Sequence, residues 1–426
     1  MRLPCARRRR EFRDPGATGR EAGMTTGGAT SLVRRPDASN RATLLELLFD
    51  VVFVAAIALV SMTIAEGESW ATTGHALLLF MAIWWTWSVT AITTDFYDPE
   101  QRPLQAILMV TAFGAVGTAA TVPRAVDGHP LLFALAYVTP HVIRGIILVG
   151  ILHRHRHKAQ ERATRFFFWF SVSGILWIIG ALLPNQPHWP LWAAALTIEY
   201  VATAARYPTP FLGRVPLDQY EKVTEHLGER YQQFVILALG DIILVPTLKI
   251  SSSDFALSRL GGFLIAFVTM LLLWQLYVYR SGSILEMTKR RRGRAARLAP
   301  YTHLVTLVGV VLVAAGADRV VHQPTGTTPL HAVVLMLGGP VLFITGRTLF
   351  TYLVQEGPSA RRLVWIPVLG AMMPFAPAWP PLLVAGAAVA VLAGVVVTDL
   401  VVARSRRRRD PEAQAEAEHS RPGPGL

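Results

Sequence analysis

Residues 44–65 read LLELLFDVVFVAAIALVSMTIA, an apolar run that is interrupted by two acidic side chains. A helix needs about 20 predominantly apolar residues to cross the hydrocarbon core of a bilayer, so this segment is predicted to span a membrane. Further segments have the same apolar character: residues 74–94, 104–122, 131–152, 166–183, 191–206, 231–248, 257–279, 300–320, 330–354, 363–375 and 382–403. The segment at 363–375 is the weakest of them, because prolines break its helical character.

The composition of the whole chain agrees with this pattern. Of the 426 residues, 52% are apolar and 16% are charged, whereas about 25% of the residues of a soluble domain are charged. An ordinary soluble enzyme is therefore excluded. The single cysteine, Cys5, excludes a disulfide framework and a cysteine-based metal site. The sequence predicts an all-α, polytopic membrane protein with about twelve transmembrane helices, and no motif in it predicts a cofactor or a metal.

Basic residues indicate how the helices are oriented. The formal net charge is +13, and most of the 41 lysines and arginines fall in the tails and in alternate connections. The connections on the opposite side hold only Arg124 and Lys249. By the positive-inside rule both termini are predicted to be cytoplasmic. The basic connections are expected to contact anionic lipid headgroups rather than nucleic acid.

The helices divide into two halves with matching charges. Ionisable residues recur in corresponding helices: Asp50 and Asp241 in the first, Arg144 and Arg347 in the fourth, Glu199 and Asp399 in the sixth. The match favours two parallel six-helix repeats, and chance placement of charges is the alternative. The predicted segments are a disordered basic tail at 1–43 (with Met24 as a second candidate start), a half at 44–206, a cytoplasmic or interfacial connector at 207–230, a half at 231–403 and a disordered tail at 404–426.

Two carboxylates in the first span are the leading candidates for a functional site. Glu46 and Asp50 are four residues apart, so a helix places both on one face. Charges at membrane depth are costly, so this face must point into the bundle, meet a cation or hold a proton. Arg144, with His141 on the same helix face, is the preferred partner of Asp50. An ion or proton site and a structural salt bridge both satisfy the pattern.

Other charges extend the set of candidates. Glu199 lies in the middle of the sixth span far from any other charge, which makes it a candidate protonatable group. Asp241 and Arg347 are expected to act as site carboxylate and counter-charge in the second half, or to form a structural pair. The polar residues His226, Glu229 and Arg230 approach the seventh span and predict either a gate or an interfacial anchor.

Two of these segments resemble a known family. The residues Leu45-Glu46-Leu47-Leu48-Phe49-Asp50-Val51-Val52-Phe53-Val54 are similar to the E-L-F-F-D-L-V-F-V signature of the bacterial low temperature requirement A (LtrA) proteins. His226-x-x-Glu229-Arg230 followed by Leu239-Gly240-Asp241 resembles that family's H-x-x-E-R and L-G-E segments, with Asp in place of Glu. The resemblance implies a multi-span bacterial inner-membrane protein linked to growth in the cold, and it implies no particular activity. A weaker similarity to the first helix of six-span-repeat potassium channels departs at the serine of that motif.

The leading functional hypothesis is a secondary transporter or an ion-conducting protein. In it Asp50 and Asp241 hold or gate cations or protons, Arg144 and Arg347 are their counter-charges, and Glu199 accepts a proton. The alternative from another class is a lipid-interacting, membrane-organising protein without transport activity. An intramembrane enzyme that used Glu46, Asp50 and His141 would lack an evident nucleophile, so we do not expect an enzyme. The transported solute or cation and the oligomeric state stay open.

Overall fold

The computed structural model describes residues 32–34, 41–126, 129–183, 187–221, 223, 225–250, 256–278, 289–355 and 360–409. Within these ranges the regular structure is helical, apart from isolated bridges such as the one between Val33 and Tyr97. The predicted all-α fold is therefore confirmed. The predicted tails at 1–43 and 404–426 lie largely outside the described residues.

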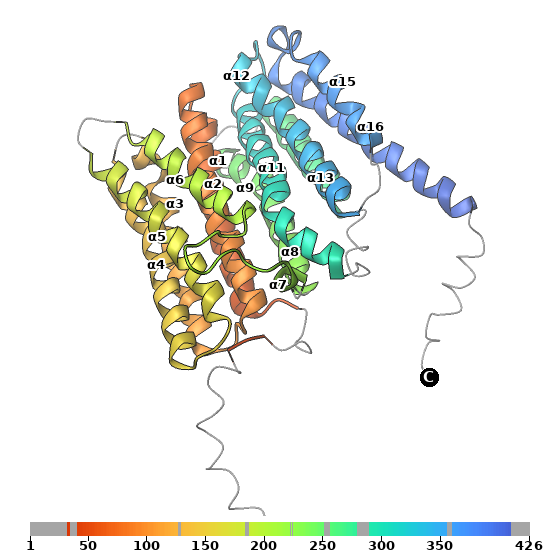
Figure 1. Ribbon diagram of the computed structural model, residues 1–426. Coiled ribbons are helices and arrows are strands. Elements are labelled where there is room, and N and C mark those ends of the chain that lie inside the picture. The colour runs from red at the N-terminus through yellow and green to blue at the C-terminus, as the bar shows by residue number, and fades with distance from the viewer. Residues whose placement is uncertain are drawn as a thin grey trace, which may run out of the picture.

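The first group of helices forms one side of the molecule (Figure 1). Helices α1 and α2 lie at the inner edge of this group, near the middle of the molecule. Helix α1 starts with a capping box, in which the Thr43 and Glu46 side chains each accept a bond from the other residue's backbone N–H. In chain order the group comprises α1 (Leu44–Glu66), α2 (Trp70–Phe96), α3 (Arg102–Val126), α4 (Leu131–Arg154), α5 (Gln160–Leu182) and α6 (Trp189–Ala204).

The second group lies on the other side of α1 and α2 in Figure 1. Helix α1 packs against α2 and α3 of the first group and against α8, α9 and α11 of the second, so it joins the two groups. The second group comprises α7 (Leu217–Glu221), α8 (Glu225–Leu239), α9 (Asp241–Ile250), α10 (Leu257–Val278), α11 (Lys289–His322), α12 (Leu330–Val333), the π-helical turn η2 (Val334–Gly338), α13 (Gly339–Gln355), α14 (Ala360–Leu363), α15 (Trp365–Met372), the 3₁₀ turn η3 (Ala376–Ala378) and α16 (Pro381–Arg409).

Ten helices in the described part of the chain are long and apolar enough to cross a membrane. Two of the twelve predicted spans are not among these ten, because their helices are too short. At 191–206 the structure has α6, with 16 residues, and at 363–375 it has α15, with 8 residues. Prolines after α15 replace the rest of that span with turns. The seventh span differs in another way, because it begins at Glu225 rather than at 231 and is broken at Gly240.

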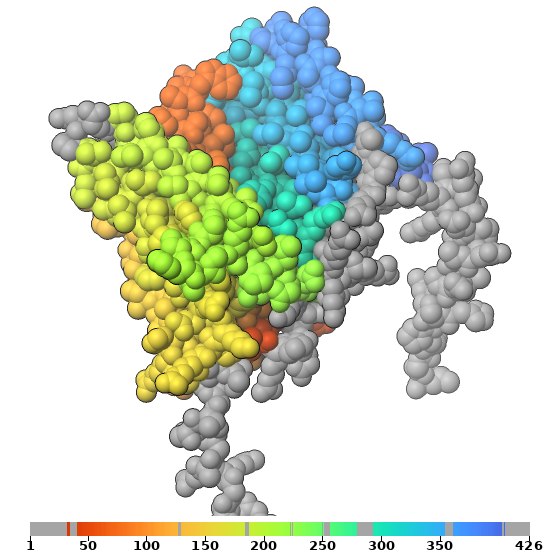
Figure 2. Space-filling view, in the orientation of Figure 1, coloured from red at the N-terminus to blue at the C-terminus, as the bar shows by residue number. Residues whose placement is uncertain are grey.

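The packing of the bundle is that of a membrane protein. Large apolar side chains such as Phe113, Val201 and Leu264 are exposed at the surface. In Figure 2 the yellow and light green part of the first group forms one flank of the molecule, and the blue part of the second group forms the other. Inside, small residues allow close approach. A Cβ atom on Gly346 of α13 would lie 2.5 Å from the backbone nitrogen of Thr306 on α11, so only glycine fits there.

A short segment before α1 is attached to the end of α2. Val33 forms an antiparallel bridge with Tyr97, and the side chain of Leu32 is buried. The guanidinium of Arg34 donates to the backbone oxygen of Thr94 at 3.2 Å. The prediction of disorder through residue 43 is therefore wrong for these residues, which share a backbone pairing with α2.

Candidate functional site

The strongest concentration of buried charge lies where α1 meets α8. Arg230 donates from Nη1 to Oε1 of Glu46 at 2.6 Å and from Nη2 to Oδ1 of Asp50 at 2.5 Å. Its Nε reaches the second oxygen of Asp50 at 3.3 Å. The side chains of all three residues are fully buried. One guanidinium is thus shared by two carboxylates away from solvent, the geometry in which charge-assisted bonds are strongest.

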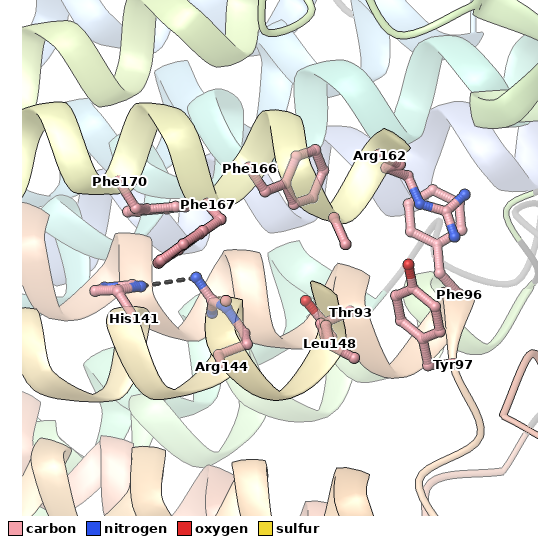
Figure 3. A pocket seen from close by; sticks show the side chains of 12 residues that line it. Thr93, Phe96, Tyr97, His141, Arg144, Leu148, Arg162, Phe166, Phe167 and Phe170 are labelled. Carbon is pink, nitrogen blue, oxygen red and sulfur yellow. Dashed lines mark hydrogen bonds between the residues drawn. The ribbon is translucent and has the colours of Figure 1, made fainter. Parts of the chain in front are cut away.

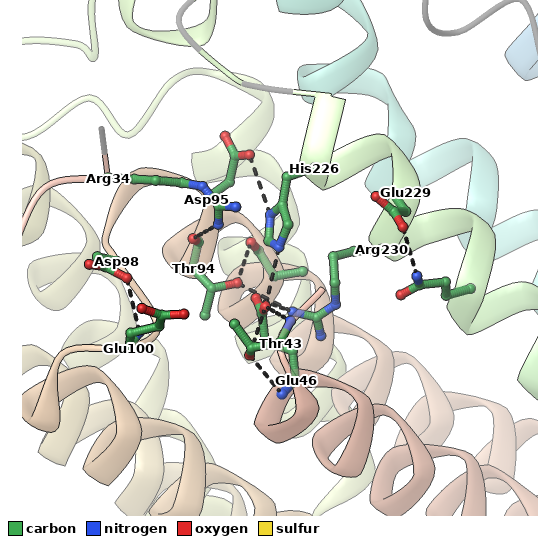
Figure 4. Close-up of polar contacts among 12 residues, drawn as sticks. Arg34, Thr43, Glu46, Thr94, Asp95, Asp98, Glu100, His226, Glu229 and Arg230 are labelled. Carbon is green, nitrogen blue, oxygen red and sulfur yellow. Dashed lines mark hydrogen bonds and ion pairs between the residues drawn. The ribbon is translucent and has the colours of Figure 1, made fainter. Parts of the chain in front are cut away.

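A histidine extends this set of charges to α2. His226 lies with Nε2 3.2 Å from Oε2 of Glu46 and with Nδ1 3.7 Å from Oδ1 of Asp95. Figure 4 shows the imidazole between these two carboxylates, with Arg230 one helical turn away on α8. We call the five residues Glu46, Asp50, Asp95, His226 and Arg230 the ion cluster. Its charged members alternate in sign when His226 is protonated.

Neutral donors and acceptors complete the surroundings of the ion cluster. The indole nitrogen of Trp87 donates to Oδ1 of Asp50 at 2.8 Å, and Nη1 of Arg230 donates to the Thr94 hydroxyl at 3.3 Å. The Thr43 backbone nitrogen donates to Oε2 of Glu46 at 2.9 Å. Glu46 and Asp50 are therefore each held in a fixed orientation by several donors.

Two identical sequence spacings build the cluster. Glu46 and Asp50 are four residues apart on α1, and His226 and Arg230 are four residues apart on α8. Each pair occupies one face of its helix, one turn apart, and the two faces meet. The predicted polar connector at 207–230 is therefore wrong from residue 225 onward, because these residues belong to a buried helix. The equal spacing was the signal that could have identified the pairing.

The preferred pairing of Asp50 with Arg144 is wrong. Arg144 lies on α4 and donates from Nη2 to Nδ1 of His141 at 2.7 Å and from Nη1 to the Thr90 hydroxyl at 3.4 Å. Its guanidinium also lies 5.1 Å from the ring centre of Phe170. Sequence periodicity placed Arg144 correctly inside the bundle, but helix order alone did not show that α8 rather than α4 faces Asp50.

Glu199 is buried inside the first group of helices, as its position in the sequence predicts. Tyr137 donates to its Oε2 at 2.5 Å, and the indole of Trp177 donates to its Oε1 at 3.2 Å. Both donors are neutral aromatic side chains, and the nearest cation, Arg144, makes no bond to Glu199. The carboxyl group therefore has the surroundings expected of a side chain that can hold a proton.

Asp241, the first residue of α9, is a second buried carboxylate, and it faces α1. Its Oδ2 accepts a bond from the Ser61 hydroxyl at 2.5 Å, and its Oδ1 has no hydrogen-bond partner among the described residues. The expected counter-charge is elsewhere: Arg347 donates to the backbone oxygen of Tyr277 at 2.9 Å and lies 5.0 Å from that residue's ring centre. The pairing of Asp241 with Arg347 is therefore wrong, because Asp241 on α9 contacts α1 whereas Arg347 on α13 contacts α10.

The remaining candidates have peripheral partners. Glu229 accepts a bond from Gln233 one turn later on α8, and it faces away from the ion cluster in Figure 4. Asp399 pairs with Arg362 near the end of α16. Sequence reasoning missed Asp95 and Ser61, although Asp95 could have been noticed as an acid at the end of a span. Among the described residues no group of three or more His, Cys, Asp or Glu side chains is arranged to hold a metal ion.

Comparisons with known proteins cover most of the chain. The family model described as bacterial low temperature requirement A protein (LtrA) matches residues 41–397. An uncharacterized protein of Rhizobium meliloti (strain 1021) is 31% identical over 311 residues, which are 71% of this chain and 75% of the relative. No solved structure gives a significant match. The range 41–397 contains the ion cluster and also Arg144, Glu199, Asp241 and Arg347.

Proposed function

The chain belongs to the bacterial low temperature requirement A (LtrA) family, and from its buried charges we propose that it is a secondary transporter or an ion-conducting protein. The single observation that carries the proposal is the ion cluster, in which Arg230 joins Glu46 and Asp50 with no solvent exposure. Intramembrane ionisable groups are rare because they are costly, and where they occur they mark ion and proton pathways.

The ion cluster is suited to exchange of partners. Glu46 is bonded both to Arg230 and to His226, so movement of either cation frees a carboxylate oxygen for an incoming cation or proton. A histidine gains or loses its charge near neutral pH, which changes how strongly Glu46 and Asp95 are held. In the proposed mechanism a cation or proton replaces one of these contacts and is released when Arg230 returns.

A second polar position lies further along the same helix. Ser61 is eleven residues after Asp50 on α1, a distance of about 16 Å along the axis of an α-helix. Its partner Asp241 is the first residue of α9, directly after the break at Gly240 that separates α9 from α8. Broken helices with a charge at the new terminus line the substrate sites of many transporters. We propose that Asp241 is the second station for the same ion.

Aromatic side chains fill the space between the two positions. Trp87 lies 4.2 Å from Phe234 and 5.0 Å from Trp84, measured between ring centres. These rings and Phe53 are fully buried or nearly so. A tightly packed apolar segment between two polar sites acts as a barrier to ions, and small movements of the helices can open it. The proposed pathway therefore follows α1 from the ion cluster to Asp241.

The same proposal includes twelve crossings with both termini in the cytoplasm. Helix α6, about 24 Å long at 1.5 Å per residue, and the α14–α15 segment would be the two short crossings. The test is cysteine accessibility in cells, with Cys5 replaced by serine. Cysteines at His129 and Arg156, on the connections before and after α4, should be labelled from opposite sides of the membrane. Labelling from the same side would contradict the topology.

Flux measurements test the transport proposal. Purified protein in liposomes should move protons or potassium ions under an imposed gradient, and Asp50→Asn should abolish this flux. Asparagine keeps an oxygen for the Trp87 bond, and Glu46 still neutralises Arg230, so the variant should fold. Asp241→Asn should also reduce flux, because the second station loses its charge. Glu161→Gln, which changes an exposed carboxylate on α5, is the matched control.

The outcomes separate transport from the alternative. Flux that persists in both Asp50→Asn and Asp241→Asn would overturn the role of the carboxylates. Absence of flux of either ion in the wild-type protein would reject a proton- or potassium-conducting protein and favour a membrane-organising role. In that case the basic connections, such as residues 153–158 between α4 and α5, would be the parts that bind anionic lipids.

A further inference from the structure

A second polar pocket lies between the end of α2, the middle of α4 and the start of α5. The empty space among its lining atoms is about 370 Å³ when the open solvent at its mouth is included. Phe96, Phe166, Phe167 and Phe170 supply apolar walls, and two arginines contribute the charge (Figure 3). We call this space the arginine pocket. Its lining includes no carboxylate side chain.

Arg144 is the more deeply buried cation of the arginine pocket. Only 4% of the residue is exposed, and its bonded partners are the neutral groups of His141 and Thr90. A guanidinium has five N–H donors, so these two bonds leave donors available toward the cavity. Within the described part of the chain no carboxylate lies within ion-pair distance of Arg144. A buried cation in this position lacks the anion that would compensate its desolvation.

Arg162, at the start of α5, is a second buried arginine with no carboxylate bonded to it among the described residues. It is 9% exposed, donates to Gln219 at 3.3 Å, and has a buried Nε with no hydrogen-bond partner in the described residues. The guanidinium lies 3.8 Å from the ring centre of Phe96. Figure 3 shows Arg162 beside Phe96 and Tyr97, and Arg144 beside His141, at different points of the pocket. Two cations without a bound carboxylate thus face one cavity.

We propose that the arginine pocket binds an oxyanion, with Arg144 as its main ligand and Arg162 as a second positive charge. The planar fork of a guanidinium matches the oxygens of phosphate and carboxylate groups. A free inorganic phosphate would use the charges alone, whereas a phospholipid headgroup would also use the phenylalanine walls for its apolar part. The proposal stands apart from the transport pathway, because it involves α4 and α5 rather than α1 and α8.

The location of the arginine pocket supports an oxyanion rather than a cation. The pocket lies near the connection at 153–158, which carries Arg154, Arg156 and Lys158 and so attracts anions to this end of the bundle. Glu199 does not act as the bonded counter-charge of Arg144, since its carboxyl group is bonded to Tyr137 and Trp177. The ligand must therefore come from outside the described residues.

Thermal unfolding of the purified protein in a neutral detergent tests the proposal. Sodium phosphate is added to one series, phosphatidylglycerol to a second and phosphatidylcholine to a third, with sodium chloride at matched ionic strength as the reference. A ligand that binds the folded state raises the unfolding temperature. We expect a rise of several degrees with phosphate or with phosphatidylglycerol, and the loss of that rise in Arg144→Gln. Arg124→Gln, which changes an exposed arginine in the last turn of α3 that does not line the pocket, should keep it.

The two anionic series identify the source of the oxyanion. A rise with sodium phosphate indicates a free oxyanion, and a rise with phosphatidylglycerol alone indicates a lipid headgroup. Ala163→Leu narrows the pocket and leaves both arginines in place, so it should also remove the rise and decides the question if Arg144→Gln does not fold. No rise with either ligand in the wild-type protein, or a rise that survives both substitutions, overturns the proposal.

Discussion

The ion cluster and the arginine pocket lie on two sides of the same helix end and differ in how their charges are balanced. Thr94 and Asp95 of α2 face the ion cluster, whereas Thr93 and Phe96 line the arginine pocket. The ion cluster combines three carboxylates with an arginine and a histidine. The arginine pocket combines two arginines and a histidine without a carboxylate in its lining. The ion cluster therefore contains charges of both signs, whereas the arginine pocket requires an anion from outside to balance its charge.

This difference determines what each site can do. Charges that compensate one another hold three helices together, and they respond to an ion only by exchanging partners. Uncompensated charges raise the free energy of the folded protein until an anion binds, so they favour binding over structural support. Removing a cation should therefore destabilise the folded protein far more at the ion cluster than at the arginine pocket.

The largest effect is expected when the ion cluster loses its cation. Arg230→Met leaves Asp50 without a cation and Glu46 with His226 alone, which should destabilise the folded protein by about 3–5 kcal/mol. Thermal unfolding in detergent measures the change. Arg144→Met removes an uncompensated charge and should cost much less in the absence of anions. Equal losses in the two variants would contradict the distinction between the ion cluster and the arginine pocket.

A triple variant shows whether the loss comes from charge. Combining Arg230→Met with Glu46→Gln and Asp50→Asn removes both carboxylates, and it should recover a large part of the lost stability. Because methionine has a flexible apolar side chain, it can fill much of the space of arginine. A triple variant as unstable as Arg230→Met would show that packing rather than charge dominates.

The shape of the arginine pocket gives the next largest effect. A Cβ atom on Gly145 of α4 would collide with the ring of Phe167, a pocket wall on α5. Gly145→Ala should destabilise the protein by up to about 3 kcal/mol through overpacking and should weaken the response to anions. Gly150→Ala, on the same helix with open space around it, should be neutral or slightly stabilising because alanine favours helices. Thermal unfolding with and without phosphate compares the two variants.

Asp241 provides an intermediate case between the two sites. It has one hydroxyl partner, Ser61, and one oxygen without a partner among the described residues. Ser61→Ala removes that hydrogen bond and should cost about 1 kcal/mol. Asp241→Asn should cost less than this, since the amide is easier to bury than a carboxylate. Unfolding temperatures of the two variants test the order, and a larger loss in Asp241→Asn would show that the charge has a partner.

The sequence predicted the elements of both sites better than their assembly. Hydropathy located the helices, and the cost of intramembrane charge correctly selected Glu46, Asp50, Arg144, Glu199 and Asp241 as buried. Pairing was not predicted, because Asp50 and Arg230 are 180 residues apart and only the packing of α8 on α1 brings them together. The crossing at 363–375 was overestimated, because the apolar composition extends past the end of α15 into residues that form turns.

The arginine pocket was missed for a related reason. Arg162 lies in the first turn of α5, where a basic residue is usually interpreted as contacting headgroups. The burial of Arg162 against Phe96 depends on where the end of α2 lies, and no local sequence pattern predicts that position. The spacing of charged residues along one helix can be derived from the sequence. Which charges on different helices neutralise one another depends on tertiary packing.

The smallest effect is expected at an ion pair that belongs to neither site. Glu161 accepts a bond from Arg165 at 3.1 Å, but its side chain is 63% exposed. Arg165 also donates to the backbone oxygen of Leu212 at 2.6 Å, so it keeps a buried partner without Glu161. Glu161→Gln should change the free energy of unfolding by less than about 0.5 kcal/mol, since exposed pairs are screened by water. Chemical denaturation at low and high salt measures this, and a loss comparable to that of Arg230→Met would show that burial does not separate structural from peripheral charges in this protein.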